Sequence, residues 1–179
     1  MNIRLATLKD APALLKIYSP YVEQTAITFE YDVPDLQEFT NRISTVLQKY
    51  PYLVAVENEE ILGFAYASAF KTRAAYAWSV ETSIYVKMDL QHKGVGTALY
   101  QELERILAMQ QVCNLCACIA YPNPPSIAFH ERLGYKTVAH FHHSGYKQGQ
   151  WYDMIWMEKE LCAPTVPPMP FLPFPLLEM

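Results

Sequence analysis

The segment from Gln91 to Thr97, Gln-His-Lys-Gly-Val-Gly-Thr, places two glycines between a strand-like run and a helix-like run, and it constrains the fold most. Residues 82–86 before it are mostly β-branched or aromatic, and apolar residues after it recur at helical spacing. The first N–H groups of a helix lack intrahelical partners, and glycine lets an anion approach them. Lys93 adds a positive charge. The segment therefore predicts a phosphate- or pyrophosphate-binding turn, although a simple structural turn is an equally good interpretation.

Two common phosphate-binding motifs do not match this segment. A Walker loop would need lysine and then serine or threonine directly after a glycine. The dinucleotide fingerprint would need a third glycine, which is missing here. The anion must therefore be identified from the rest of the chain.

The composition fits one globular domain. Of the 179 residues, 51% are hydrophobic and 18% are charged, which allows a sizeable core. The net charge of −4 argues against a nucleic-acid-binding protein, whose surface usually carries a basic face. No run approaches the roughly 18 apolar residues that span a bilayer, and the first four residues do not resemble a signal peptide. We therefore expect a cytoplasmic protein without a nucleic-acid or membrane partner.

The four cysteines do not predict a metal site or a disulfide framework. Cys113 and Cys116 have the C-x-x-C spacing of half a metal or redox motif, but no second ligand pair follows at zinc-finger spacing. Cys116 and Cys118 lie in a run that resembles a buried strand, and Cys162 is isolated. We expect reduced thiols in or near the core, where free cysteine is common.

The hydrophobic pattern predicts a definite order of elements. It comprises a strand at 3–6, a helix opened by Thr7-x-x-Asp10, a helix capped by Asp35, strands at 52–56, 61–68 and 76–86, a helix after the glycines, a strand at 115–120, a short helix from 123 to 134, and strands at 135–140 and 152–159. This order predicts an α+β domain with a mostly antiparallel mixed central sheet and about four flanking helices.

The last part of the chain has a different composition. Six prolines occur between residues 163 and 179. Such a segment is extended and has no core of its own. We therefore expect one domain at 1–162, and a C-terminal extension at 163–179 that packs on the surface or on a partner subunit.

Glu81 is an acidic residue in the middle of a strand that is otherwise rich in apolar and hydroxyl side chains. A solvent-facing carboxylate would explain it. A partly buried carboxylate with a raised pKa could instead accept the proton of an attacking amine. Glu81 is therefore a candidate general base.

The loop at 71–76 and the linker around Phe29 are candidates for an acceptor site. Lys71 and Arg73 are ordinary surface charges in one interpretation. In the other, Arg73 binds an acidic group of a substrate in a bidentate manner. Phe29 is either a core residue or an aromatic wall of the same site.

Three histidines near residue 140 suggest a metal site at first sight. His140 and His142 would share a strand face. However, no carboxylate or cysteine is placed in the sequence to complete a ligand set, so the sequence predicts no metal.

The pattern Gln91-x-x-Gly94-x-Gly96 after a hydrophobic strand, together with the order of elements, resembles the GCN5-related N-acetyltransferases (GNAT). In that family the backbone amides of this loop hold the pyrophosphate of acetyl-CoA.

The short helix resembles a family pattern through Asn123, Ser126, His130 and Gly134. At His130 the family commonly has a tyrosine that protonates the departing CoA thiolate. The resemblance implies that His130 is the general acid, for which the pKa of histidine is suitable; a histidine that only fills a helix face is the alternative. Asn123 would contact CoA or cap the helix.

A closer resemblance, to the phosphinothricin N-acetyltransferases, spans essentially all 179 residues. It is carried by the proline-rich tail and two further stretches, Lys71-x-Arg73-x-x-Tyr76-x-Trp78-x-x-Glu81 and Gly145-Tyr146-Lys147-x-Gly149-x-Trp151-x-Asp153. One departure is His92-Lys93, where family members often carry arginine or glycine. Because backbone amides bind the phosphate, this difference changes little.

The resemblance implies acetyl-CoA as co-substrate and a homodimer with acceptor sites near the subunit interface. Glu81 would be the base and His130 the acid. The residues implied to bind acetyl-CoA are Ile84, Tyr85, Val86, Gln91, His92, Lys93, Gly94, Val95, Gly96, Thr97, Asn123 and Ser126. Those expected to bind the acceptor are Phe29, Arg73, Ala74, Ala75 and Tyr76.

The expected reaction is direct transfer of an acetyl group to the amine of a small amino-acid-like acceptor, such as phosphinothricin or methionine sulfoximine or sulfone. A backbone amide near Val86 would hold the oxyanion. Acetylation of a protein N-terminus or a polyamine is the alternative within enzymes. A non-catalytic acetyl-CoA-binding module is the alternative from another class.

Overall fold

The computed structural model describes residues 1–90 and 94–178. Its strands are β1 (Asn2–Leu5), β2 (Tyr52–Glu57), β3 (Glu60–Ala69), β4 (Ser79–Val86), β5 (Asn114–Tyr121), β6 (Lys136–Lys147) and β7 (Gln150–Glu160). Its helices are α1 (Ala11–Gln24), α2 (Leu36–Leu47), α3 (Val95–Met109) and α4 (Pro124–Arg132). Short 3-10 turns lie at Leu8–Asp10, Ala74–Tyr76, Met88–Leu90 and Phe174–Leu176.

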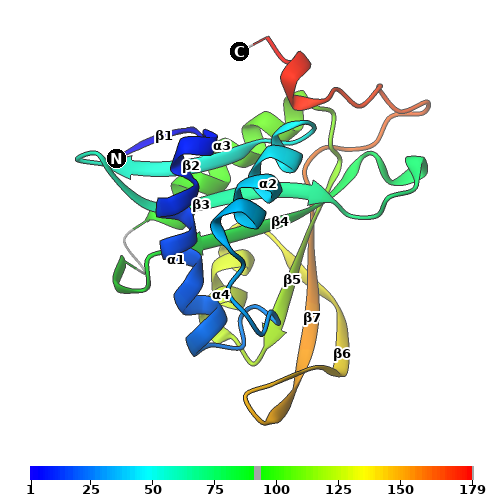
Figure 1. Cartoon of the computed structure of the whole chain (residues 1–179). Helices are drawn as coiled ribbons and strands as arrows, with labels where there is room; N and C mark the ends of the chain where they lie inside the picture. Colours follow the sequence, from blue (N-terminus) through cyan, green and yellow to red (C-terminus); the bar gives the residue numbers. More distant parts are fainter. Residues whose placement is uncertain (91–93, 179) are drawn as a thin grey trace.

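The strands form one seven-stranded sheet in the order β1-β2-β3-β4-β5-β7-β6. Neighbouring strands are antiparallel except β4 and β5, which are parallel. Figure 1 shows α1 and α2 on one face of this sheet and α3 and α4 on the other. The expected α+β architecture, with a mixed and mostly antiparallel sheet and four flanking helices, is therefore confirmed.

Each face of the sheet carries its own core. Helix α3 buries Leu99, Leu103 and Leu107, which recur every fourth residue along the helix, against the inward side chains of β2, β3, β5 and β7. Helices α1 and α2 bury Leu14 and Ile43 on the opposite face. The two faces of the central strands are both covered, which explains why these strands are nearly continuous apolar runs.

Local signals set the starts of the first two helical segments. The Asp10 carboxylate accepts a hydrogen bond from the Thr7 N–H at 2.7 Å, as the Thr7-x-x-Asp10 pattern predicts. The Asp35 carboxylate accepts from the Glu38 N–H at 2.8 Å and caps α2. Each of these hydrogen bonds joins residues only three positions apart, and both helical segments begin where the capping patterns predict.

The predicted boundaries of three strands are wrong. The strand expected from residue 76 begins at Ser79, because Ala74–Tyr76 form a 3-10 turn. The strands expected at 135–140 and 152–159 are longer and form a hairpin, β6 and β7, that turns at residues 148 and 149. Here the long-range pairing of the two strands outweighs the weak local strand signal of residues 141–147.

The C-terminal extension lies against the domain in this chain. The Leu172 N–H donates to the Gln110 carbonyl at 3.0 Å, and the Trp78 indole donates to the Met169 carbonyl at 2.7 Å. Phe171 and Phe174 pack against the core that includes the buried face of α3. Among the residues that the structure describes, no helix is both long and apolar enough to cross a membrane.

Candidate active site

The sheet opens between its two parallel strands. Pairing of β4 with β5 runs from Ser79–Asn114 to Glu81–Cys116, and β4 then continues to Val86 paired with β3. Beyond Glu81 the two strands therefore separate. An inner cavity that is partly open to solvent, with about 430 Å³ of empty space, lies in the gap and is lined by residues 82–85 of β4 and 117–120 of β5.

A larger cleft of about 1120 Å³, open to solvent, continues from this gap. Its walls are Ile84 and Val86 of β4, residues 94–97 at the start of α3, and Asn123, Ser126 and Phe129 at α4. The two cavities share Ile27, Ile84, Asn123 and Ser126. Together they form a channel from the N-terminus of α3 to the point where the sheet opens.

The glycines at the start of α3 have different roles. Gly94 is the N-cap and has a φ of 81°, a left-handed conformation that favours glycine. A Cβ at Gly96 would lie 3.1 Å from the Phe129 ring and 3.3 Å from Ile84. Residues 94–97 at this helix start line the cleft, in the stretch for which the sequence predicts a pyrophosphate site. Gln91, His92 and Lys93 belong to the same prediction but lie outside the described residues.

The remaining residues expected to bind acetyl-CoA lie along this channel. Tyr85 lines the inner cavity, and the Val86 carbonyl accepts a hydrogen bond from the Tyr21 hydroxyl. The Asn123 side chain accepts from the Ser126 N–H at 3.3 Å, so Asn123 caps α4 in addition to lining both cavities. The structure thus brings the described members of the predicted cofactor set to one place.

His130 is buried in the wall of the inner cavity, where both of its ring nitrogens have partners. Nδ1 lies 2.8 Å from the Ser126 carbonyl oxygen, and Nε2 lies 3.1 Å from the Tyr100 hydroxyl. A carbonyl can only accept, so Nδ1 of neutral His130 carries the proton, and Nε2 is the unprotonated nitrogen that lies beside the Tyr100 hydroxyl. Burial lowers the pKa of His130, and the hydrogen bond to the Ser126 carbonyl opposes that effect.

Tyr100 joins His130 to the strand that carries Glu81. Its hydroxyl also lies 3.2 Å from Thr82 Oγ1, and Thr82 donates to the Cys116 carbonyl at 3.2 Å. The sequence analysis did not single out Tyr100 or Thr82. Tyr100 lies on the buried face of α3, and only its hydroxyl, which the apolar spacing does not reveal, distinguishes it from a core residue.

Glu81 lies on the other face of the sheet. Successive strand residues point to opposite faces, so Thr82 points toward α3 and α4 whereas Glu81 points toward the side of α1 and α2. Burial raises the pKa of the Glu81 carboxyl, and the nearby positive charge of Lys71 lowers it in part. Glu81 and His130 therefore lie on opposite faces of the sheet; His130 lines the inner cavity, and Glu81 directly precedes Thr82, which also lines it.

The loop expected to bind the acceptor is exposed. Residues 71–76 are all exposed, and Tyr76 is 41% exposed. Lys71 Nζ lies 4.9 Å from the centre of the Phe70 ring, and Phe70 packs edge-on against Trp156 of β7. This loop precedes the Ser79 end of β4. In one chain this loop is therefore an exposed surface.

Phe29 lies at the other end of the sheet opening. Its ring packs directly on Gly145 of β6, where a Cβ would lie 2.5 Å from Phe29 Cε2, and faces Tyr152 of β7. Lys147 fixes the same linker by donating to the Val22 and Thr28 carbonyls at 2.7 and 2.8 Å. Phe29 is thus a neighbour of the β6–β7 hairpin, and the described contacts do not join it to Arg73.

One part of the argument against a metal site was wrong. The sequence analysis found no carboxylate for His140 and His142, but Asp153 of β7 contacts both of them. Asp153 is 11 residues away from His142 along the chain, and only the pairing of β6 with β7 brings it close.

Comparison with known proteins gives the same family throughout. The acetyltransferase (GNAT) domain family matches residues 3–156. Phosphinothricin N-acetyltransferase of Streptomyces viridochromogenes is 34% identical over 173 residues, which are 97% of this chain and 94% of the relative. The L-methionine sulfoximine/L-methionine sulfone acetyltransferase of Pseudomonas aeruginosa is 32% identical over 89% of this chain and 94% of its own.

Solved structures agree with the sequence relatives. A phosphinothricin acetyltransferase from Sinorhizobium meliloti, in complex with acetyl-CoA, superposes with a TM-score of 0.89. It is 33% identical and covers 97% of each chain. The described channel and these likenesses together place the chain among the GCN5-related N-acetyltransferases, in the phosphinothricin N-acetyltransferase family, whose members transfer an acetyl group from acetyl-CoA to an amine.

Proposed function

We propose that this enzyme acetylates the amine of a small amino-acid-like acceptor of the phosphinothricin or methionine sulfoximine and sulfone type. The observation that carries this proposal is the partly buried Glu81 at the opening of the sheet, close enough to Lys71 for that charge to lower its pKa. An acceptor with an acidic group would be attracted to Lys71 and bound by Arg73, whose guanidinium suits bidentate contact with a carboxylate or phosphinate. Relatives named for such acceptors align over most of the chain, which supports the same choice.

The proposed chemistry is direct attack. Glu81 takes a proton from the acceptor ammonium, and the free amine attacks the thioester carbonyl carbon of acetyl-CoA. A backbone N–H near Val86 stabilises the oxyanion. The carbon–sulfur bond then breaks, the attacking nitrogen releases its second proton to water and keeps the acetyl group as an amide, and the CoA thiolate receives a proton. No covalent acyl-enzyme intermediate is needed.

We propose His130 as the acid that supplies this last proton, through Nε2. The neutral ring has its single proton on Nδ1, bonded to Ser126, so only the imidazolium form carries a proton at Nε2. The imidazolium form is lost as the pH rises through the pKa of His130. Because burial lowers this pKa, the loss occurs at a lower pH than for an exposed histidine. The role of His130 thus predicts a pH dependence that a purely structural histidine would lack.

The donor is proposed to lie along the channel from the start of α3 to the sheet opening. The N–H groups of residues 94–97, with Gln91, His92 and Lys93 next to them in sequence, would bind the pyrophosphate. Ile84, Tyr85 and Val86 would pair with the pantetheine arm as a strand does, and Asn123 and Ser126 would line the opposite wall.

A homodimer would complete the acceptor site. The loop with Ala74, Ala75 and Tyr76 is exposed in one chain, and the described contacts of Phe29 are with the β6–β7 hairpin and not with this loop. A second subunit that covers this loop would close the site.

We also propose the cytoplasm as the compartment, because the described cysteines are all free thiols, the form that reducing compartments maintain.

Three alternatives to this proposal remain. A ribosomal-protein-alanine N-acetyltransferase from Brucella melitensis superposes with a TM-score of 0.86 at 31% identity, which favours a protein N-terminus as the second candidate acceptor. A polyamine is a further acceptor. A module that only binds acetyl-CoA is the alternative without catalysis.

A thiol-release screen tests these proposals. Acetyl-CoA is incubated with the enzyme and with phosphinothricin, methionine sulfoximine, methionine sulfone, standard amino acids, polyamines or peptides, and free CoA is measured. We expect CoA release with the first three acceptors. Release with peptides or polyamines alone would contradict the small-acceptor proposal. Tight acetyl-CoA binding without release for any amine would contradict catalysis.

A further inference from the structure

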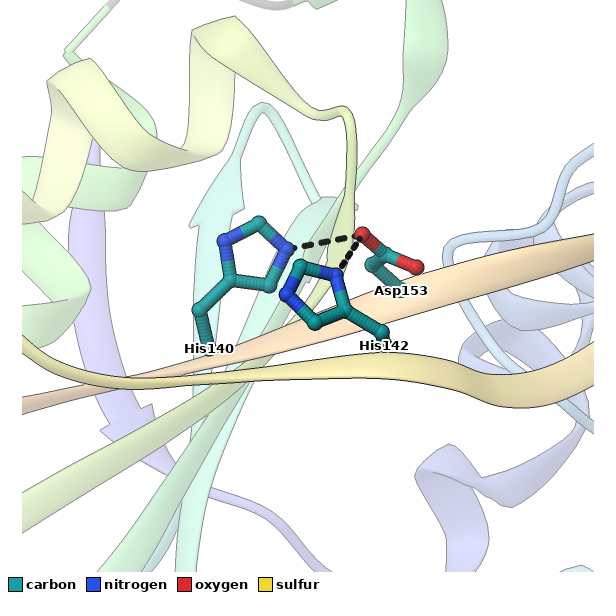
Figure 2. Close-up of side chains that lie close together, drawn as sticks. All are labelled: His140, His142 and Asp153. Carbon is teal, nitrogen blue, oxygen red and sulfur yellow. Dashed lines mark hydrogen bonds and ion pairs between the residues drawn. The ribbon is translucent and has the colours of Figure 1, made fainter.

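Two histidines and one carboxylate meet at the hairpin of β6 and β7. His140 Nε2 lies 2.8 Å and His142 Nδ1 lies 2.9 Å from the same oxygen, Asp153 Oδ2. Figure 2 shows the two rings pointing toward this oxygen from one strand while Asp153 projects from the next. The three ligand atoms all lie within 4.8 Å of one another.

An irregularity in strand pairing creates this arrangement. Phe141 pairs with Met154 and Gly145 pairs with Tyr152, so three residues of β6, 142–144, lie opposite Asp153 alone. Such a bulge changes the direction in which side chains point. It lets His142, two residues after His140, reach the same carboxylate.

The bulge also fixes the carboxylate. His143 has a φ of 50°, which is uncommon for a residue other than glycine, and its N–H donates to Asp153 Oδ1 at 2.9 Å. Oδ1 is therefore held by the backbone while Oδ2 faces the two imidazoles. The Tyr121 ring packs beside His140 with centroids 4.9 Å apart and limits the positions that this ring can adopt.

We propose that His140, His142 and Asp153 form a binding site for a divalent first-row transition-metal ion, of which Zn²⁺ is the natural probe. Imidazole nitrogens suit zinc, copper, iron and nickel, whereas magnesium and calcium prefer oxygen ligands. Two nitrogens and one carboxylate oxygen make a facial set of three protein ligands. The side chains are 37%, 70% and 24% exposed for His140, His142 and Asp153, so water can complete the coordination.

The geometry needs only a small adjustment to accept an ion. Zinc–nitrogen and zinc–oxygen distances of about 2.0 to 2.2 Å at a tetrahedral angle place the ligand atoms about 3.4 Å apart. The present separations of 2.8 and 2.9 Å must therefore widen by roughly half an ångström. Rotation of the exposed His142 ring can supply this movement. Each imidazole ring then binds the ion through the lone pair of one nitrogen and carries its proton on the other nitrogen.

This site is separate from acetyl transfer. The proposed reaction uses no metal, and neither Glu81 nor His130 belongs to the set. An ion at His140, His142 and Asp153 would instead link β6 to β7 at the bulge. The proposal therefore does not depend on the identity of the acceptor.

The test is zinc binding to the full-length chain, measured by isothermal titration, with one matched control. His140→Gln and His142→Gln each remove one ligand, and the double variant removes both. His143→Asn is the control, because it removes a neighbouring histidine that is not a ligand, keeps the backbone N–H to Asp153, and places asparagine where φ is positive. All variants keep the same four cysteines, so any zinc bound by thiols is equal among them.

We expect the wild type and His143→Asn to bind one zinc ion more than the double variant, and each single variant to bind it at least tenfold more weakly. Cobalt(II) at this site should lack the charge-transfer absorption of a cobalt–thiolate bond. Equal zinc stoichiometry and affinity in the wild type and the double variant would overturn the proposal. Loss of binding in His143→Asn alone, or no zinc binding by the wild type, would also overturn it.

Discussion

Replacing Glu81 by glutamine tests the base on which the proposed reaction depends. Glutamine keeps the shape of the side chain and removes its ability to accept a proton. General-base catalysis typically contributes about 10²- to 10⁴-fold, so we expect kcat at neutral pH to fall by roughly that factor, or about 3 to 5 kcal/mol in the activation barrier. The acetyl-CoA site lies along the channel, so the affinity for acetyl-CoA should change little in comparison.

The pH profile sharpens this test. The base must be deprotonated, so activity falls as the pH drops below the pKa of Glu81. Burial raises that pKa and Lys71 lowers it, so Lys71→Gln should shift the acidic limb of the profile toward higher pH. Lys9→Gln, at an exposed lysine in another part of the fold, should leave the limb in place. Unchanged turnover of Glu81→Gln between pH 6 and 9 would remove Glu81 from the mechanism.

Four further experiments follow from the contacts described. If the His130 imidazolium donates the proton, kcat falls as the pH rises through the lowered pKa of His130. His130→Gln should abolish this fall on the basic side of the pH profile. The same fall in the variant would assign the acid to another group. Gly145→Ala places a Cβ 2.5 Å from Phe29, so we expect the free energy of unfolding, measured by urea titration, to fall by about 1 to 3 kcal/mol and the acceptor KM to rise. Unchanged stability would contradict the contact. Gly96→Ala brings a Cβ within 3.1 Å of Phe129 and should raise the KM for acetyl-CoA without changing that for the acceptor; the reverse pattern would place the donor elsewhere. Asp35→Ala removes the cap of α2 and should lower unfolding free energy by about 1 kcal/mol, while Asp35→Asn, which can still cap, should lose less.

Much of the fold could be predicted because its signals are local. The helix starts at Thr7 and Asp35 depend on hydrogen bonds to residues three positions away. The buried face of α3 repeats with the period of the helix, and Gly94 is the N-cap at its start. The order of these elements, with the two motif stretches, was sufficient to identify the family.

The errors and omissions involve contacts between distant parts of the chain. The length of the β6–β7 hairpin comes from pairing between its strands, and the same pairing brings Asp153 to His140 and His142. Tyr100 looked like an ordinary core residue until the fold placed its hydroxyl beside His130, 30 residues later. The sequence pattern contains no information on such partners.

The sequence by itself determined the family, the glycine turn at the start of α3, and the residue types that acetyl transfer needs, because these follow from periodicity and motif spacing. Only the tertiary structure decided where those residues face. It separated β4 from β5 beyond Glu81, placed Glu81 and His130 on opposite faces of the opening, and left the 71–76 loop exposed. The physical reason is that strand pairing and burial depend on packing across the whole sheet, whereas caps and helical periodicity depend on neighbours within a few residues.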